Sequence, residues 1–453
     1  MPIAETVSMP VAELSGPVAR TESSRAHVLD PYGLDRMPKY DYLQEEYLVG
    51  GTAAGADFGT RILVRRPADV ARCSGTVIAE VSHIWGGTSV WRAINRYVMR
   101  NNHVWVEIDS QAPSALGLIA AADPERYRSF RFNEAETARA LAAGIPFQRA
   151  AGRDELAAQY DAFMTRWWEA TRQSPEIIAS VAAALRQGLP GCGFAARRIY
   201  LGGISQTGGV VREFIRRHHR RYLTPVFDGY LPGASGGPAL PDIDVPVIEL
   251  LGEAEFQSVR EPCGISGQVR GLTHRRPDSE RFRLYEVAGM AHRETRYMSD
   301  VDRQRLAACP LPPGANWSSF PNGHVYHAVW QALLDWREHD TAPLPSQHLA
   351  TVGDTDELAR DEHGNALGGL RTSYTDVPTS TLVAATPVGR PSWYHGNETP
   401  FDSRKLARLY GTPEGYQRAV AVHLDQYLHV GTYLPIDAAE IRDQPRVNGP
   451  IRA

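Results

Sequence analysis

Short apolar runs alternate with longer helical stretches along the first three quarters of the chain. The runs are rich in β-branched and aromatic residues and are bounded by Gly, Pro or polar turns, as buried strands are. They lie at 61–65, 75–81, 103–108, 198–202, 226–231, 245–251 and 282–287. The clearest helical segment is 89–101, where Val90, Ile94 and Val98 share one face. This alternation predicts an α/β fold in which helices flank a mostly parallel sheet.

Two segments depart from this rhythm. Residues 124–187 have helical patterns without a good strand, so we expect a lid-like helical insertion over the strand ends. After residue 340 a Pro- and Thr-rich linker precedes two further helical patterns, at 403–410 and 414–430. We therefore expect a core at 1–340 and a C-terminal extension at 341–453 packed on it.

The composition excludes several classes of protein. With 453 residues and a net charge of −4, the chain has no overall basic field that would attract nucleic acid or an anionic membrane. Its lysines are Lys39 and Lys405, and no Gly-Lys pair exists for a Walker-type phosphate loop. No apolar run approaches 18 residues, and the N-terminus lacks the features of a signal peptide. We expect a cytoplasmic protein that binds neither nucleic acid nor membrane, and the oligomeric state is left open.

The cysteines and histidines give no sign of a metal or another cofactor. Four widely spaced cysteines form no C-x-x-C pair, so we expect free thiols rather than a disulfide framework or a zinc ribbon. No set of histidines and carboxylates has metal-ligand spacing. The sequence therefore predicts neither a metal nor a cofactor.

The sharpest local signal is GGISQTGG at 202–209, which directly follows one strand and precedes a helical run. Strand, tight turn and helix together form the context of a nucleophile elbow. In this context the hydroxyl of Ser205 stands above the sheet, and the backbone N–H of Gln206 at the helix start faces a developing oxyanion. Thr207 stands where the strict G-x-S-x-G motif has Gly. A capping serine in a Gly-rich turn, or a phosphate-binding loop, is the alternative.

A serine nucleophile needs a base and an acid, which follow it along the chain as acid and then histidine. Among the downstream histidines, His292 follows a predicted strand most closely and is our candidate base. The acid should follow the strand at 245–251, where Glu253 and Glu255 are both candidates. We prefer Glu255, because an acid that orients the imidazole should lie a few residues beyond the strand, and Glu253 is the alternative.

The loop after the strand at 75–81 should supply a second oxyanion donor. Its residues 82–88 read SHIWGGT, and the paired glycines allow close backbone approach. We expect the donor near His83 and Ile84, with His83 and Trp85 near the substrate. A purely structural role for His83 is the alternative.

With these residues in place, the chain resembles the α/β-hydrolase superfamily. More narrowly, it resembles a bacterial family described as alpha/beta hydrolase domain-containing proteins. Matching segments run nearly end to end and include YLVGGTA (47–53), GGISQTGG (202–209), DVPVIELLGEAEF (244–256), RFRLYEVAGMAH (281–292) and DEHGNALGG (361–369). The family pattern G-x-S-Q-[ST]-[AG] accommodates Thr207. The resemblance implies an α/β-hydrolase fold with Ser205 as nucleophile, His292 as base and Glu255 in the place of the family's usual Asp.

Two departures concern the substrate. Relatives often have L-N-V-S-G-G where this chain has SHIWGG at 82–87, and the stretch after Phe130 is longer than the usual connection. The expected activity is serine hydrolysis of a small-molecule carboxylic ester through an acyl-enzyme. An acyltransferase with the same triad and a non-catalytic binding protein on this fold are the alternatives.

Overall fold

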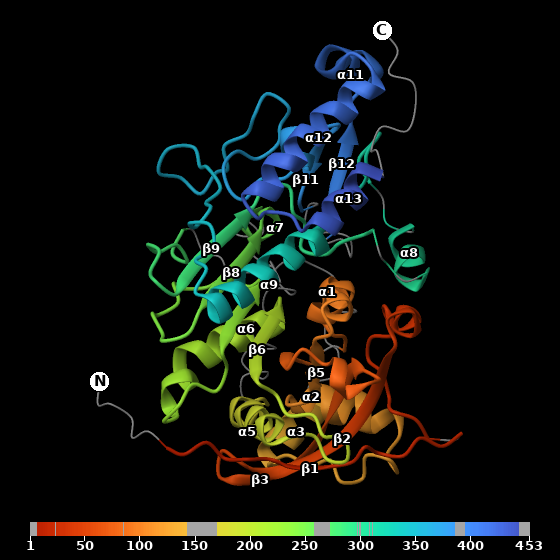
Figure 1. Cartoon of the computed structure of the whole chain (residues 1–453), viewed down its shortest axis with the longest axis vertical. Helices are drawn as coiled ribbons and strands as arrows, with labels where there is room; N and C mark the ends of the chain where they lie inside the picture. Colours follow the sequence, from red (N-terminus) through yellow and green to blue (C-terminus); the bar gives the residue numbers. More distant parts are fainter. Residues whose placement is uncertain are drawn as a thin grey trace. The chain divides into compact units, whose positions relative to one another are not determined.

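The computed structural model describes the chain except residues 1–6, 23, 85, 143–169, 258–271, 297, 299, 308, 310, 386–394 and 444–453. The chain divides into two compact units (Figure 1). The first unit contains residues 1–233 and 240–247, and the second contains 234–239 and 248–453. These units are a different partition from the sequence-based domains, and the division at residue 340 stays a prediction.

Among its described residues, the first unit contains seven strands of the sheet, in the order β1-β2-β3-β5-β4-β6-β7. Their bounds are β1 Glu13–Ser15, β2 Tyr42–Ala53, β3 Ala56–Pro67, β4 Thr76–Val81, β5 Val104–Ile108, β6 Arg198–Ile204 and β7 Gly229–Gly233. The central strands β5, β4, β6 and β7 pair in parallel, whereas β1, β2 and β3 add an antiparallel edge. The predicted α/β class and its parallel core are confirmed. The long strand β2 was not predicted.

Burial explains why the central strands could be predicted from the sequence. Every residue of β4 and of β5 is buried, which matches the continuous apolar runs typical of parallel strands covered on both faces. The predicted helix forms as α1, Ser89–Arg100, and buries Val90, Ile94 and Val98. This helix and these strands fix the two ends of the loop at 82–88.

Glu80 of β4 anchors the start of α1. Its carboxylate accepts hydrogen bonds from the amides of Val90 and Trp91, at 2.9 and 2.7 Å, and from the indole N–H of Trp105 at 2.9 Å. These amides belong to the first turn of a helix, where backbone donors have no partner within the helix. Burial raises the pKa of Glu80 to about 8. The Glu80 side chain thus caps α1 from the neighbouring strand.

The first unit also contains further helices. They are α2 Ala112–Ser114, α3 Glu134–Ala142, α5 Ser174–Gln187 and α6 Gln206–Glu213, with short 3-10 or π segments at Leu34–Tyr40, Val70–Arg72, Ala115–Ala120, Phe214–His218 and His219–Arg221. Within the predicted insertion, α3 and α5 are helical as expected, and 143–169 lie outside the described residues. A lid function for this segment stays a prediction.

The second unit begins its regular structure at β8, Val247–Gly252, whose first residue belongs to the first unit. The strand β9, Phe282–Val287, lies beside β8. A separate small sheet has the order β10-β12-β11, with Asn316–Trp317, Asn397–Pro400 and Ser380–Val383 paired antiparallel. The helices are α7 Glu253–Gln257, α8 Asp300–Ala307, α9 Asn322–His339, α10 Ser373–Asp376, α11 Ser403–Tyr410, α12 Pro413–His429 and α13 Pro435–Asp443.

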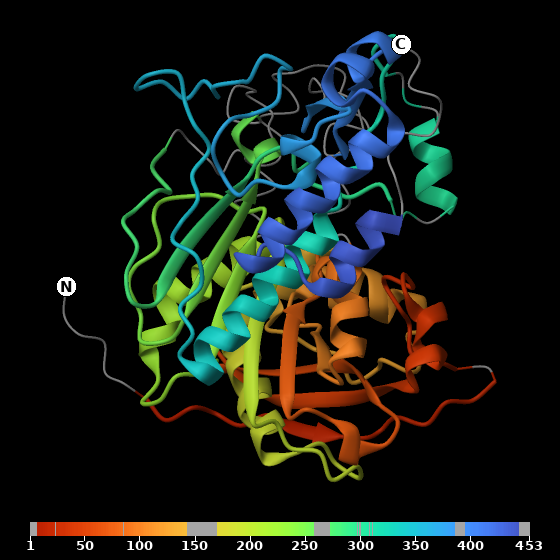
Figure 2. The same ribbon diagram turned by 45° about the horizontal axis from the view of Figure 1, so that its top comes forward.

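The helices near the C-terminus agree with the sequence patterns. The predicted segments 403–410 and 414–430 form α11 and α12 within one residue. Two of these ends are capped by side chains: Asp402 accepts from the Lys405 amide, and Thr412 accepts from the Gly415 amide. Figure 2 shows α9 and α13 of this unit side by side. Among the helices that the structure describes, none combines the length and apolar character needed to cross a bilayer.

Candidate active site

Ser205 lies between the end of β6 and the start of α6, in a backbone conformation that L-residues rarely adopt. Its φ is 63° and its ψ is −123°. Its amide donates to the carbonyl of Gly233 at 2.9 Å, and its side chain is half-buried. A non-glycine residue held in such a region costs about 1–3 kcal/mol, which the surrounding structure must impose. This is the strained turn that the sequence pattern predicts for a nucleophile elbow.

The residues around the turn explain why it forms here. A Cβ on Gly203 would lie 2.2 Å from the carbonyl oxygen of Thr207, so a side chain at position 203 does not fit. The amide of Ile204 donates to Oγ1 of Thr207, and this hydroxyl donates to the Ile204 carbonyl, both at 2.9 Å. Thr207, which departs from the strict motif, therefore fastens the turn with its own side chain.

A pair of glutamines joins the elbow to the loop after β4. Nε2 of Gln206 donates to Oε1 of Gln111 at 2.8 Å, and Nε2 of Gln111 donates to Oε1 of Gln206 at 3.2 Å. Gln111 also donates to the carbonyl of Ser82 at 2.9 Å. Sequence reasoning missed Gln111. The available signal was its position just beyond the strand at 103–108, at the edge where the other candidates lie.

The loop at 82–88 forms a closed turn. The amide of His83 donates to the Gly87 carbonyl at 3.0 Å, and the amide of Gly86 donates to the His83 carbonyl at 2.7 Å. The Ile84 amide donates to Oε1 of Gln206 at 3.3 Å, which is longer than a typical N–H···O bond. His83 and Ile84 are the two residues predicted to supply the second oxyanion donor. Of their two amides, that of Ile84 thus makes the weaker hydrogen bond. Trp85 lies outside the described residues.

In the second unit the structure brings His292 to Glu255. Nδ1 of His292 lies 2.7 Å from Oε1 of Glu255, and the carboxylate is 1% exposed. The other oxygen of Glu255 accepts from the Gly252 amide at 2.6 Å. An ionised carboxylate can only accept, so Nδ1 donates and the basic lone pair of a neutral imidazole lies on Nε2. This is the tautomer that a general base requires.

Backbone contacts between the ends of β8 and β9 set this pair. The Ala254 amide donates to the Met290 carbonyl at 3.2 Å. A Cβ on Gly252 would lie 2.7 Å from that same carbonyl, so this approach needs glycine. The close packing of the two strand ends places the α7 carboxylate beside the loop that carries His292.

Glu253, the alternative acid, has other partners. It is fully buried, accepts from the Gly289 amide at 2.8 Å and pairs with the Arg360 guanidinium at 2.9 Å. These bonds hold the turn after β9 and the segment around Arg360. The partners of Glu253 are therefore structural, whereas Glu255 is the carboxylate that contacts His292. The catalytic roles themselves stay predictions.

The family model described as "Alpha/beta hydrolase domain" matches residues 7–443. The chain belongs to the alpha/beta hydrolase domain family. The match covers both units, and it confirms the predicted resemblance and the fold class. Because it extends to residue 443, the helices near the C-terminus are part of the family architecture. No curated protein matches this alpha/beta hydrolase domain chain significantly.

Solved structures of three kinds of enzyme show weak similarity. A poly(3-hydroxybutyrate) depolymerase from Bordetella parapertussis is 13% identical over 70% of this chain and 96% of its own, with a TM-score of 0.28. Fungal esterases from Rhizomucor miehei are 8% identical over 56% of this chain and 78% of theirs, with a TM-score of 0.29. A CE15 esterase from a marine bacterial metagenome is 8% identical over 62% and 82%, with a TM-score of 0.27. At these scores the family assignment follows from the family match alone.

Proposed function

We propose that this alpha/beta hydrolase domain protein hydrolyses a small-molecule carboxylic ester, with Ser205 as the nucleophile. The observation that carries the proposal is the strained backbone of Ser205, with φ 63°, at a turn between β6 and α6. Such strain persists where the surroundings impose it, and it clusters at functional sites. Family membership supports the same reaction class.

In the proposed reaction, Oγ of Ser205 attacks the ester carbonyl while Nε2 of His292 takes the hydroxyl proton. The imidazolium then returns this proton to the leaving alcohol, and an acyl-enzyme forms. Water, deprotonated by the same nitrogen, attacks the acyl carbonyl. The imidazolium returns this proton to Oγ of Ser205 as the bond from the acyl carbon to Oγ breaks and the acid is released. Glu255 holds Nδ1 of His292 at 2.7 Å and stabilises the imidazolium in both halves of the reaction.

The oxyanion donors in this proposal come from the first unit. The Gln206 amide is the first in α6 and has no acceptor within the helix. The second donor is the Ile84 amide, which exchanges its 3.3 Å bond to the Gln206 side chain for the oxyanion. Stabilisation by one such donor is typically worth 10²–10³ in rate, or about 3–4 kcal/mol.

The test compares Ser205→Ala with wild-type protein in the hydrolysis of p-nitrophenyl esters. We expect turnover to fall to near the uncatalysed rate in Ser205→Ala. Ser129→Ala is the matched control, because Ser129 is an exposed serine of the same unit. Undiminished turnover in Ser205→Ala would exclude the proposed nucleophile. Product analysis with added alcohols separates hydrolysis from acyl transfer, since a transferase forms the new ester in preference to the acid.

A further inference from the structure

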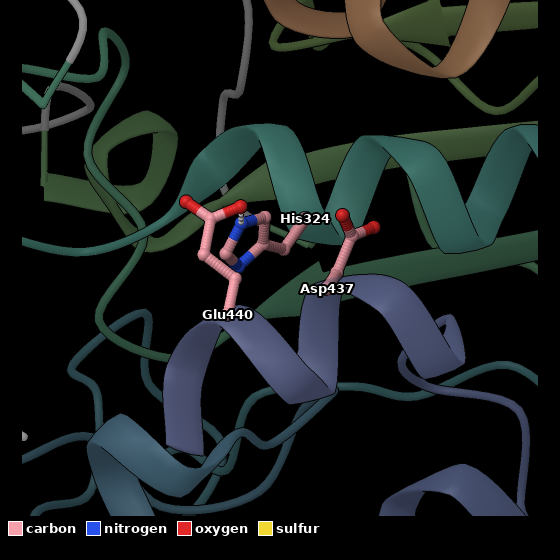
Figure 3. Close-up of side chains that lie close together, drawn as sticks. All are labelled: His324, Asp437 and Glu440. Atoms are coloured by element: carbon pink, nitrogen blue, oxygen red, sulfur yellow. Dashed lines mark ion pairs between the residues drawn. The ribbon is translucent and has the colours of Figure 1, made fainter. Parts of the chain in front are cut away.

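A cluster of possible metal ligands lies between two helices of the second unit, α9 and α13 (Figure 3). We call His324, Asp437 and Glu440 the helix-pair cluster. One ligand atom from each residue lies within 4.8 Å of the other two. Nε2 of His324 and Oε2 of Glu440 are 3.5 Å apart. His324 and Asp437 are fully buried, whereas the Glu440 side chain is 18% exposed.

The spacing on α13 explains how the carboxylates meet the histidine. Asp437 and Glu440 are three residues apart, so they share one face of the helix. In Figure 3 both project from α13 toward α9, and Glu440 lies beside the His324 ring. The two helices are far apart in sequence, since α9 ends at His339 and α13 begins at Pro435. For this reason spacing along the chain gave no sign of a metal site. The expectation that the protein holds no metal is qualified by the contacts that the fold creates.

Neighbouring side chains hold both carboxylates in place. Nδ1 of His327 lies 2.7 Å from Oδ2 of Asp437. Arg296 donates to Oε1 of Glu440 at 3.0 Å, which turns Oε2 of the same carboxylate toward His324. Partners of this kind orient the ligands of metal sites and are important for affinity.

The charges around the cluster favour a cation. Arg296 is shared between two carboxylates, because it lies 3.8 Å from Glu294 and 3.0 Å from Glu440. Buried carboxylates are costly unless they are paired or coordinate a metal. A cation held among His324, Asp437 and Glu440 would offset the charge of the two cluster carboxylates.

We propose that the helix-pair cluster binds a zinc ion that joins α13 to α9. An imidazole nitrogen with two carboxylate oxygens is a zinc donor set, whereas Ca²⁺ and Mg²⁺ prefer oxygen alone. Tetrahedral Zn²⁺ at its usual bond lengths places ligand atoms roughly 3.3 Å apart. The 3.5 Å separation between Nε2 of His324 and Oε2 of Glu440 is close to this value, and the ligand atom of Asp437 lies within 4.8 Å of those of the other two residues. Water takes the fourth position. The ion's role is to link the helices.

Zinc content and thermal unfolding of the full chain test this proposal without any measurement of activity. Protein stripped with a chelator and dialysed against Zn²⁺ should retain one equivalent by elemental analysis. At a free Zn²⁺ concentration of about 100 Kd, the unfolding temperature of a chain of this length should rise by roughly 3 °C. Equal concentrations of Ca²⁺ or Mg²⁺ should leave it unchanged.

Variants locate the ion. Glu440→Gln changes a partly exposed ligand and should weaken zinc binding at least tenfold, as should the buried change Asp437→Asn. His339→Gln is the matched control, because His339 is an exposed histidine at the end of α9 and should leave binding unchanged. Absence of bound zinc in the wild-type protein would overturn the proposal, as would unchanged affinity in Glu440→Gln. The cluster would then be a salt-bridge network that docks α13.

Discussion

Replacing Ser205 with glycine separates a strained nucleophile turn from an ordinary one. At an ordinary position glycine is less stable than alanine by about 0.5–1 kcal/mol, because the unfolded chain gains freedom. Ser205 has φ 63° and ψ −123°, where a Cβ is strained and glycine is not. At this position we therefore expect the glycine variant to be more stable than the alanine variant.

The magnitude follows from two opposing terms. Relief of the backbone strain contributes about 2 kcal/mol, the middle of the usual range. The greater freedom of glycine in the unfolded chain offsets about 0.7 kcal/mol of that gain. Ser205→Gly should thus be more stable than Ser205→Ala by about 1 kcal/mol. Comparing these two variants cancels the loss of the hydroxyl group, which both share.

Urea unfolding followed by fluorescence measures the difference in unfolding free energy between the two variants. It is obtained from the shift in the urea midpoint when both variants have the same slope m. Ser129 supplies the control pair, because it is exposed, in the same unit and without a positive φ. There, the glycine variant should be the less stable of the two. If Ser205→Gly were also less stable than Ser205→Ala, the turn would carry no strain, and the reasoning from backbone to nucleophile would fail.

Four further variants test the site and one buried histidine. Glu255→Gln should lower kcat about 10³–10⁴-fold with little loss of stability. Glu253→Gln should instead lower the unfolding free energy by about 2 kcal/mol, with a smaller effect on kcat. Steady-state kinetics and urea unfolding of both variants check these expectations. Gln111→Ala should reduce kcat/KM roughly 10–100-fold, because it releases the loop at 82–88 from the elbow. A kcat/KM equal to that of the wild-type protein would exclude a positioning role for Gln111. Burial lowers the pKa of His103 to about 4, so between pH 6.5 and 4 the unfolded chain takes up a proton that the native state does not. About 3 kcal/mol of stability should be lost across that interval in the wild type, and the loss should be smaller in His103→Gln, which urea unfolding at several pH values measures.

The elbow was predictable because its signals are local. A buried strand, a glycine whose Cβ would clash, and a helix start all fall within 198–213. The same holds for His292 and Glu255, each of which lies within five residues of the end of a buried strand. Local signals do not show which carboxylate reaches the histidine. That choice depends on contacts between the two strand ends.

The strand β2 was missed because its buried face contains charges. Arg61 of β3 is fully buried and bonds to Glu46 of β2 at 2.6 Å and to Asp109 at 2.7 Å. A carboxylate inside a strand disrupts the apolar alternation on which sequence reasoning relies. The partners that make this burial tolerable are known only from the fold. Gln111 and the helix-pair cluster escaped prediction for the same reason, since their partners are distant in sequence.

Covalent labelling tests the central claim, that Ser205 is a reactive nucleophile, most directly. A fluorophosphonate reacts with an activated serine hydroxyl, and peptide mass spectrometry locates the adduct. We predict a single adduct on Ser205 in the wild-type protein, slower labelling in His292→Ala and none at this position in Ser205→Ala. An unlabelled Ser205 in folded wild-type protein, or labelling that His292→Ala leaves at the wild-type rate, would contradict the account.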